Sequence, residues 1–349
     1  MKRSHHIIKL LHGQRGGVAI WFALLLPVLL GVAALAVDLA HINMAKTELQ
    51  NAADAAALAG ARLLTDPSGE QPYSWTIAEN TAKSVAKQNY ANGSLVQDAN
   101  LSVDSGYWNI PGSSYSPSHT STVTGDVPAV RATVSIPGLK LFFAPIWGIV
   151  ARDVHASAIA VIAPPGGGPV FPFAITQSIF NPSWWDFDQN KPKINPLTGA
   201  PYSIKVSLDS VYPSGGKGNW TSLTYPIGQG SSKDPIIGDI INAGDNTAPV
   251  SIGQSIWIAT GTMDNLYKNK QYTLPIGDDV AVPVVQNVIP GSWQTIVAIA
   301  GFHIDAVGGN GNKSFFTGHF IDAATISSLN PGNGNGLPYG AYTPPLLVK

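Results

Sequence analysis

The stretch that decides the fold is Val18-Ala19-Ile20-Trp21-Phe22-Ala23-Leu24-Leu25-Leu26-Pro27-Val28-Leu29-Leu30. It lies within residues 16–37, a run of 22 positions that contains no charged side chain. As a helix this run would be about 33 Å long, enough to cross a hydrocarbon core of about 30 Å. A core helix of a soluble protein would also need a polar face for water, which this run lacks. The sequence therefore predicts a transmembrane helix at residues 16–37.

The charges on either side of this run predict its orientation. Residues 1–15 hold four Lys or Arg and no acid, whereas the remaining chain holds 16 Lys and Arg against 21 Asp and Glu. Because basic flanks stay in the cytoplasm, we expect a cytoplasmic tail and an exported bulk.

A cleaved signal peptide is the alternative to a permanent anchor. Ala34-Leu35-Ala36 fits a small-x-small cleavage site. However, the apolar run is longer than the core of a signal peptide, and a helical pattern continues through the proposed site. The sequence favours an uncleaved signal anchor.

Composition limits the classes of protein to which the chain can belong. Only 12% of the 349 residues are charged, against about 25% in an average soluble domain. The absence of Cys excludes a disulfide scaffold, a thiolate metal site and a cysteine nucleophile. A net charge of −1 argues against a globally basic nucleic-acid binder, so we expect no nucleic-acid partner.

An alanine-rich helix is predicted to continue directly from the membrane run. Residues 40–59 contain neither Gly nor Pro, and Asp66-Pro67 ends the pattern. A seam of small and apolar residues, spaced four and three apart, comprises Ala45, Leu49, Ala52, Ala56, Ala59 and Leu63. Because small residues let helices approach closely, this seam either packs on the chain's own next helix or binds helices of partner subunits. Two heptads are too few to decide between these alternatives.

The remainder is predicted to contain one more helix and then mostly strands. Residues 75–90 place apolar side chains on one face, and Thr76 with Glu79 fits a capping box. No Glu follows residue 79, while β-branched residues and turn residues become frequent. The expected strands lie at residues 130–136, 154–162, 202–209, 255–259, 280–285, 293–304 and 314–321. The fold class is therefore α+β, with a predominantly antiparallel β region arranged as a sandwich or a barrel.

Shifts in composition divide the chain into seven segments. They are a basic tail at 1–15, the transmembrane helix at 16–37, a helical stalk with the second helix at 38–92, a small β region at 93–163, a Pro/Gly linker at 164–169, a β-rich domain at 170–329 and a flexible tail at 330–349. The linker rests on Pro164-Pro165-Gly166-Gly167-Gly168-Pro169, and the tail rests on alternating Asn and Gly after residue 330.

An aromatic cluster formed by Trp184, Trp185 and Phe187 is a candidate for ligand stacking. Tryptophan offers a large surface on which a sugar ring or a partner chain could stack. The alternative is that the cluster caps the β core, as aromatic residues commonly do.

Two further motifs imitate metal sites. Asp186-Phe187-Asp188-Gln189-Asn190 is similar to the start of a calcium loop, yet Lys191 replaces the required Gly and Leu197 the required Glu. His303 with Asp305 and His319 with Asp322 could converge across adjacent strands, although nothing in their spacing demands a metal. The chain also lacks a nucleophile elbow, a phosphate loop and a zinc-protease motif. We therefore expect no catalytic, cofactor or metal site and no small-molecule substrate.

The N-terminal region resembles a known family. The motifs that carry the resemblance are Arg15-Gly16-Gly17-Val18-Ala19-Ile20-Trp21-Phe22-Ala23-Leu24-Leu25-Leu26-Pro27, Val37-Asp38-Leu39 and Leu49-Gln50-Asn51-Ala52-Ala53-Asp54-Ala55-Ala56-Ala57-Leu58-Ala59-Gly60-Ala61. They resemble the TadE/TadG-like proteins of Flp (tight adherence) pilus assembly. A weaker likeness extends to residue 163 through Leu141-Phe142-Phe143-Ala144 and Val154-His155-Ala156-Ser157-Ala158-Ile159-Ala160. The resemblance implies a single-pass bacterial inner-membrane protein with a periplasmic bulk, which acts with other Tad-type assembly proteins.

One departure from the family pattern favours its TadG-like branch. Members processed by a prepilin peptidase are cut after a Gly and carry Glu at the fifth mature position. After a cut at Gly16 or Gly17 that position would be Trp21 or Phe22, neither of which supplies a carboxylate. Some TadG-like proteins also carry a von Willebrand A module, but its Asp-x-Ser-x-Ser motif is missing here.

The leading functional hypothesis is a membrane-anchored, non-enzymatic assembly factor that docks partner subunits through its N-terminal helix. The alternative is a membrane-anchored module that binds cell-wall carbohydrate, motivated by the Trp cluster. A membrane-bound hydrolase with Asp-based chemistry is a third hypothesis, for which the sequence offers no residue signature.

Overall fold

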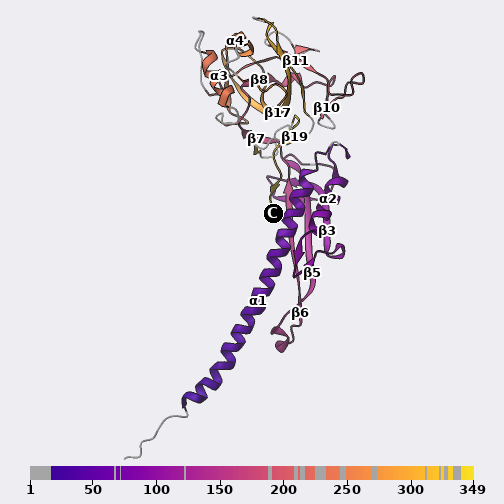
Figure 1. Cartoon of the computed structure of the whole chain (residues 1–349), viewed down its shortest axis with the longest axis vertical. Helices are drawn as coiled ribbons and strands as arrows, with labels where there is room; N and C mark the ends of the chain where they lie inside the picture. The colour runs from indigo at the N-terminus through magenta and orange to yellow at the C-terminus, as the bar shows by residue number, and fades with distance from the viewer. Residues whose placement is uncertain are drawn as a thin grey trace, which may run out of the picture.

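The N-terminal helix, α1 (Gly17–Arg62), is a single rod of 46 residues in the computed structural model of the chain (Figure 1). The residues that the structure describes are 17–66, 68–70, 72–121, 123–187, 191–207, 211–212, 217–224, 233–243, 249–261, 263–268, 273–310, 313–321, 324–325, 329–332 and 339–349. At 1.5 Å per residue α1 is about 69 Å long. Among the described residues it is the one helix long and apolar enough to cross a membrane. The continuous helix predicted from the membrane run is therefore confirmed.

The surroundings of α1 change near its middle. Residues 19–30 are exposed all round, as are most of residues 31–37. From Asp38 onward one side of the helix is buried at spacings of three and four residues. The first part of α1 thus has almost no protein against it, whereas the second part belongs to a folded domain.

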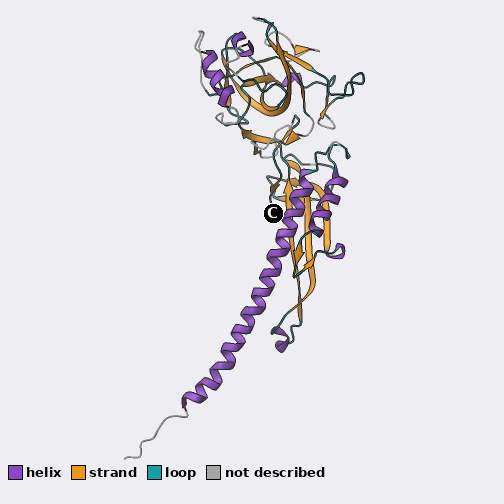
Figure 2. Ribbon diagram, in the orientation of Figure 1, coloured by secondary structure: helices purple, strands orange, loops and turns teal. Residues whose placement is uncertain are grey.

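That domain, which we call the lower domain, is a five-stranded antiparallel sheet covered on one face by helices (Figure 2). The strand order is β22 (Leu346–Leu347), β6 (Ala151–Val161), β5 (Asp126–Lys140), β3 (Leu101–Asn109) and β4 (Ser114–Ser116). The C-terminal half of α1 and the second helix, α2 (Trp75–Lys87), pack side by side on this sheet. Alternating burial along β5 and β6 agrees with the strands predicted at 130–136 and 154–162.

Small side chains bring these layers close together. The core holds alanines of α1 and α2, among them Ala52, Ala56, Ala78 and Ala82, against alanines of β5 and β6. The neighbouring layers leave no room for a side chain at Gly60. An added Cβ there would lie 2.9 Å from the Ala78 carbonyl oxygen and 3.0 Å from a Val130 methyl group. The alanine-rich composition of residues 45–61 is therefore the condition for this close packing.

The upper domain is a curled eight-stranded sheet (Figure 2). Its order is β12 (Val211–Tyr212), β11 (Ile204–Ser207), β18 (Phe315–Phe320), β17 (Ser292–Gly308), β16 (Asp279–Val285), β8 (Phe173–Thr176) and β13 (Gly218–Trp220), with β15 (Ser255–Ile258) paired to β17. All neighbours are antiparallel except β16 and β8. The strands predicted at 202–209, 255–259, 280–285, 293–304 and 314–321 are confirmed as β11, β15, β16, β17 and β18.

Shorter elements complete the chain. The remaining strands are β1 (Tyr90–Ala91), β2 (Ser94–Leu95), β7 (Pro165–Gly168), β9 (Trp185–Asp186), β10 (Lys191–Pro192), β14 (Val250–Ser251), β19 (Ala324–Thr325), β20 (Asn330–Pro331) and β21 (Ala341–Tyr342). The remaining helices are η1 (Asp98–Asn100), η2 (Ala144–Trp147), η3 (Gln177–Ile179), α3 (Lys233–Ala243) and α4 (Asp264–Lys268). Sequence periodicity did not indicate α3 or α4, because both are short and α3 contains Pro235 and Gly238.

Two segment predictions need correction. Residues 164–169, expected to form a linker, are not a free one, since β7 pairs with β14 and β20. Of the tail expected at 330–349, Tyr339 and Ala341 are buried in the cores of the upper domain, and residues 342–349 return to the lower domain. There Thr343 donates its N–H to the Ala163 carbonyl oxygen at 3.0 Å, and β22 pairs with β6. Backbone hydrogen bonds on the open edge of β6 hold a segment whose composition alone indicates a loop.

The capping box predicted for the second helix is also wrong. The N-cap of α2 is Ser74, one residue before the helix, and its side chain bonds the Asp66 carbonyl oxygen instead of capping. Thr76 donates its N–H to the Glu70 carboxylate, while Glu79 accepts hydrogen bonds from the N–H and hydroxyl of Ser105. The carboxylate of Glu79 therefore ties α2 to β3 and does not close the helix end.

Gly60 provides a test of the close packing between α1 and its neighbours. We expect Gly60→Val to destabilise the full-length protein by about 1–3 kcal/mol, because its side chain overlaps atoms of α2 and β5. Ala59→Val is the matched control, since residue 59 is only partly buried and carries the same β-branched cost in a helix. Thermal unfolding in detergent measures both variants, and equal midpoints would contradict the packing.

The return of the C-terminus is tested by ending the chain at Pro345. Ile159 donates its N–H to the Lys349 carbonyl oxygen at 2.7 Å, and this bond is lost in the shortened chain. We expect faster hydrogen exchange at the Ile159 amide and unchanged exchange at Ala132 in the middle of the sheet. The double variant Leu346→Ala, Leu347→Ala keeps the backbone bonds and should exchange like the parent. Unaltered exchange at Ile159 in the shortened chain would refute the pairing.

Candidate functional site

The apolar half of α1 is the largest exposed hydrophobic surface among the described residues. Trp21 and Phe22 are 68% and 66% exposed, and every large side chain between them and Leu30 is exposed as well. Patches of this size on soluble proteins mark binding surfaces. Residues 17–37 extend about 32 Å without a charge, which makes this half of α1 long and apolar enough to span the hydrocarbon of a membrane.

Asp38 lies where this apolar half ends. Although it carries a charge, it is only 2% exposed. Its Oδ1 accepts the N–H of Phe142 at 2.7 Å and its Oδ2 accepts the N–H of Ala144 at 2.6 Å. Both oxygens also receive the N–H of Phe143, at 3.3 and 3.0 Å. One carboxylate therefore satisfies three consecutive backbone donors that lie more than a hundred residues away in the chain.

These donors belong to the tip of the long hairpin formed by β5 and β6, which we define as residues 141–150. The 3-10 turn η2 closes the tip, and its N-terminus points at Asp38. In Figure 1 this turn is the short coil below the label of β6, next to the first residues of that strand and on the same side as α1. Donors at the start of a helical turn form a favourable site for an anion, which explains why a carboxylate can be buried here.

The electrostatics of Asp38 favour its charged form. Burial alone would raise the pKa of the Asp38 carboxyl group. The N–H groups of Phe142, Ala144 and Phe143, together with nearby His41, outweigh burial and hold the pKa below its ordinary value. Asp38 is therefore ionised at neutral pH and remains so in mildly acidic solution.

His41, one turn further along α1, extends the contact. Its ring lies 4.8 Å from the ring of Phe142, and its Nε2 is 3.1 Å from Oδ1 of Asn92. Asn92 stands in the turn between β1 and β2 with a positive φ of 51°, and its N–H donates to Glu48 at 2.6 Å. Three side chains of α1 thus hold two separate loops of the domain.

The helix seam is the first of the predicted site regions to be placed. Ala45, Leu49, Ala52 and Ala56 have no exposed surface and lie in the core between α1 and the sheet. Ala59 and Leu63 are partly buried. Of the two alternatives for the seam, its packing within the chain is the one observed for the four buried residues. They offer no surface to a partner helix.

The aromatic cluster is likewise part of a core. Trp184 and Trp185 are 2% and 1% exposed, and the ring of Trp185 meets Phe180 at 5.1 Å. Neither indole presents a face to a sugar, so ligand stacking on these two residues is wrong, and they fill the core. Phe187 is exposed, but a single phenyl ring forms no stacking platform.

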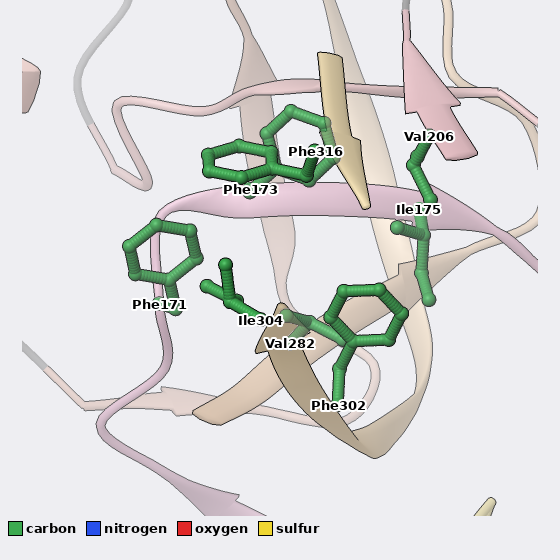
Figure 3. A pocket seen from close by; sticks show the side chains of 8 residues that line it. All are labelled: Phe171, Phe173, Ile175, Val206, Val282, Phe302, Ile304 and Phe316. Carbon is green, nitrogen blue, oxygen red and sulfur yellow. The ribbon is translucent and has the colours of Figure 1, made fainter. Parts of the chain in front are cut away.

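The upper domain also encloses a small apolar pocket. Its lining comprises Phe171, Phe173, Ile175, Val206, Val282, Phe302, Ile304 and Phe316, whose side chains point toward one another (Figure 3). Ligand sites combine such surfaces with a few polar groups that fix orientation. None of these eight side chains is polar, so the pocket belongs to the core.

The residues of the two metal-like motifs are only partly described. In the calcium-like loop, Asp188, Gln189 and Asn190 lie outside the described residues. His303 and His319 face each other across β17 and β18, with ring centroids 4.9 Å apart. Their Nδ1 atoms pair with Asp279 at 2.7 Å and Asp305 at 3.2 Å, while Asp322 lies outside the described residues. In the described part of the chain, no group of three or more His, Asp or Glu is placed to hold a metal ion.

One polar cluster has no counterpart among the sequence motifs. The Ser105 hydroxyl lies 2.7 Å from Glu79 Oε1 and 2.9 Å from His119 Nε2, and the His119 ring stacks on Trp75 at 4.5 Å. Ser, His and an acid are the residue types of many hydrolase sites, yet Ser105 is 1% exposed and no substrate reaches it. The cluster joins α2, β3 and the loop between β4 and β5. Its members lie on three separate segments, so no motif spacing could reveal it.

The Asp38 contact could not be found from sequence patterns either, although both of its halves lie in family motifs. Val37-Asp38-Leu39 and Leu141-Phe142-Phe143-Ala144 are far apart in the chain, and the structure brings them together. A charged residue directly after an apolar run is the signal that could have drawn attention to Asp38.

We expect Asp38→Ala to loosen the hairpin tip, because three buried N–H groups lose their acceptor. Hydrogen exchange at Phe142, Phe143 and Ala144 should accelerate, and the thermal midpoint should fall by several degrees. Asp38→Asn keeps one carbonyl acceptor and should show a smaller effect. The partly exposed Asp54→Ala, on the same helix, is a charge-matched control outside the tip. Parental exchange rates at the tip in Asp38→Ala would contradict the contact.

The lowered pKa of Asp38 gives this contact a defined pH dependence. A carboxyl group with a lower pKa in the folded state stabilises the protein above its unfolded-state pKa of about 4. This contribution is lost as pH falls from that value through the folded-state pKa. We expect Asp38→Asn to unfold with less pH dependence than the parent below pH ~4, with little difference in slope above pH ~5. Identical acid-unfolding curves would contradict the ionised contact.

Comparison with family models agrees with the motifs. A model described as Flp pilus-assembly TadE/G-like matches residues 16–63, and one described as Tad-like Flp pilus-assembly matches residues 59–160. Together they span α1, α2 and the hairpin of β5 and β6, and so include both sides of the Asp38 contact. No curated protein and no solved structure matches the chain. The resemblance of residues 16–160 to the TadE/TadG-like proteins of Flp pilus assembly is therefore confirmed by both family models.

Proposed function

We propose that the protein is a membrane-anchored, non-enzymatic assembly factor of a Flp-type pilus, and that it docks partner subunits through residues 19–37 of α1. The observation that carries this proposal is the division of α1. Its second half is fixed in the core of the lower domain, whereas its first half presents its side chains outward. A partner helix within the membrane can contact only this first half.

The exposed half has a face suited to helix packing. Ala19, Ala23, Pro27, Gly31 and Ala34 are spaced by four, four, four and three residues, and Asp38 follows four residues later. Small residues at such spacings let helix backbones approach closely within a bilayer. At Gly31 an added Cβ would meet no atom within 4 Å, so the chain's own fold does not require a glycine there. Close approach of a second helix would supply such a requirement.

Charge supports the orientation in the proposal. The basic residues 1–15 would remain in the cytoplasm, and both β domains would lie in the periplasm of a bacterial inner membrane. In this arrangement α1 would hold the lower domain at a fixed distance from the membrane, because the helix is continuous through Asp38.

The test uses the helix face and leaves the core intact. Removing residues 1–64 would also delete buried core residues such as Leu49, so loss of function would be uninformative. We instead expect Ala23→Leu combined with Gly31→Leu to reduce co-purification of Tad pilus proteins from membranes at least ~10-fold, which corresponds to about 1.4 kcal/mol. Helix propensity and membrane insertion are preserved by both changes.

Leu25→Phe combined with Leu29→Phe is the matched control. These residues lie on another side of the helix, and the changes keep its apolar character. Co-purification should survive in this variant. If the Ala23, Gly31 double variant also retains its partners, docking through this face is wrong and the contact must lie on the periplasmic domains.

A further inference from the structure

The hairpin tip carries a second exposed apolar surface. The tip, residues 141–150, contains no charged side chain, and the indole of Trp147 is its only polar side-chain group. Leu141 and Ala144 are buried, whereas Phe142, Ile146, Trp147 and Val150 are exposed by 65%, 77%, 58% and 64%. Four large apolar side chains of the tip are therefore more than half exposed.

Most backbone N–H groups of the tip are hydrogen-bonded within the protein. Asp38 accepts the N–H groups of residues 142–144, and Pro145 has none to donate. Leu141, Ile146, Gly148 and Ile149 donate theirs to carbonyl oxygens within the tip at 3.0–3.2 Å. Such pairing lowers the cost of moving the loop into apolar surroundings, where each unpaired backbone donor is costly. Both the side chains and the main chain thus suit burial in an apolar medium.

The position of the tip identifies that medium. Asp38, which holds the tip, follows directly on the charge-free residues 17–37. The tip therefore lies beside α1 at the level where the membrane segment ends. Lys140 and Arg152 flank the tip at the base of the two strands, and both are exposed. Basic residues next to Trp and Phe are typical of the boundary between lipid headgroups and acyl chains.

We propose that residues 142–150 insert into the interfacial region of the lipid bilayer, on the side where α1 leaves the membrane. The tip is then a second membrane contact, with Lys140 and Arg152 facing anionic headgroups. The inference rests on α1 as a membrane anchor and does not depend on docking of pilus subunits. The exposed basic flanks and the position of the tip beside the end of the charge-free run favour lipid over a protein partner as the occupant.

The absence of Cys makes a direct test possible. A single cysteine introduced at an exposed position can carry an environment-sensitive NBD label in the otherwise unaltered full-length chain. The test positions are Ile146→Cys and Val150→Cys, whose side chains contact little of the protein. Leu24→Cys reports the membrane segment, and Leu197→Cys, at 92% exposure in the upper domain, reports water.

Each labelled chain is placed, one copy per disc, in nanodiscs of phosphatidylethanolamine and phosphatidylglycerol. We expect iodide in the solution to quench labels at 146 and 150 several-fold less than the label at 197. Lipids with a nitroxide group high on the acyl chain should quench labels at 146 and 150 several-fold more than the label at 197. Two label positions guard against a local disturbance at either one.

Each remaining outcome overturns the inference and has a separate meaning. If labels at 146 and 150 respond like the label at 197, the tip lies in water. If they are shielded from iodide but insensitive to nitroxide lipids, protein covers the tip. If the label at 24 also fails to respond to nitroxide lipids, the anchor itself is wrong and the proposed function falls with it. A response at 24 without one at 146 rejects the tip contact alone.

Discussion

The contact between the Asp38 carboxylate and three consecutive N–H groups of the hairpin tip joins the membrane segment to the folded domain. A buried carboxylate is tolerated only where hydrogen bonds replace its water, and here Phe142, Phe143 and Ala144 supply them. The donors in turn need the carboxylate, because their loop carries large apolar side chains and little water reaches its inner side. The carboxylate and the three N–H groups can therefore be buried together, because each supplies the hydrogen bonds that the other would otherwise make with water.

The same helix meets two different surroundings, and its composition changes accordingly. Residues 19–30 are apolar and exposed on all sides, as a lipid environment would require. Alanine and Gly60 dominate the buried side of residues 45–61, because a sheet and a second helix approach that side closely. Asp38 marks the change between these regimes, so the fold of the domain and its relation to the membrane depend on one position.

The parts of the fold that follow from local pattern could be predicted, and the parts that follow from distant contacts could not. A charge-free run of residues and alternating burial along β5 and β17 are local signals, and both agree with the structure. The pairing of β22 with β6 depends on an open strand edge formed almost two hundred residues earlier. The Asp38 contact and the buried seam likewise depend on what lies opposite in space. The pair of Trp184 and Trp185 shows this limit of sequence-based prediction most clearly. Two adjacent tryptophans look the same in a sequence whether they are exposed or buried, and here they are buried.

A membrane protein held by one helix can rotate about that helix and tilt with it, whereas a second contact restricts both motions. The hairpin tip lies to one side of α1 and is fixed there by Asp38 and by the packing of Phe142 on His41. Interfacial side chains are a recognised determinant of helix tilt and rotation in bilayers. With α1 continuous and the lower domain packed on it, any restriction at the tip would be passed to the sheet above. Under the proposed function, a fixed tilt and rotation would keep the small-residue face of α1 in a constant orientation toward other subunits in the membrane plane.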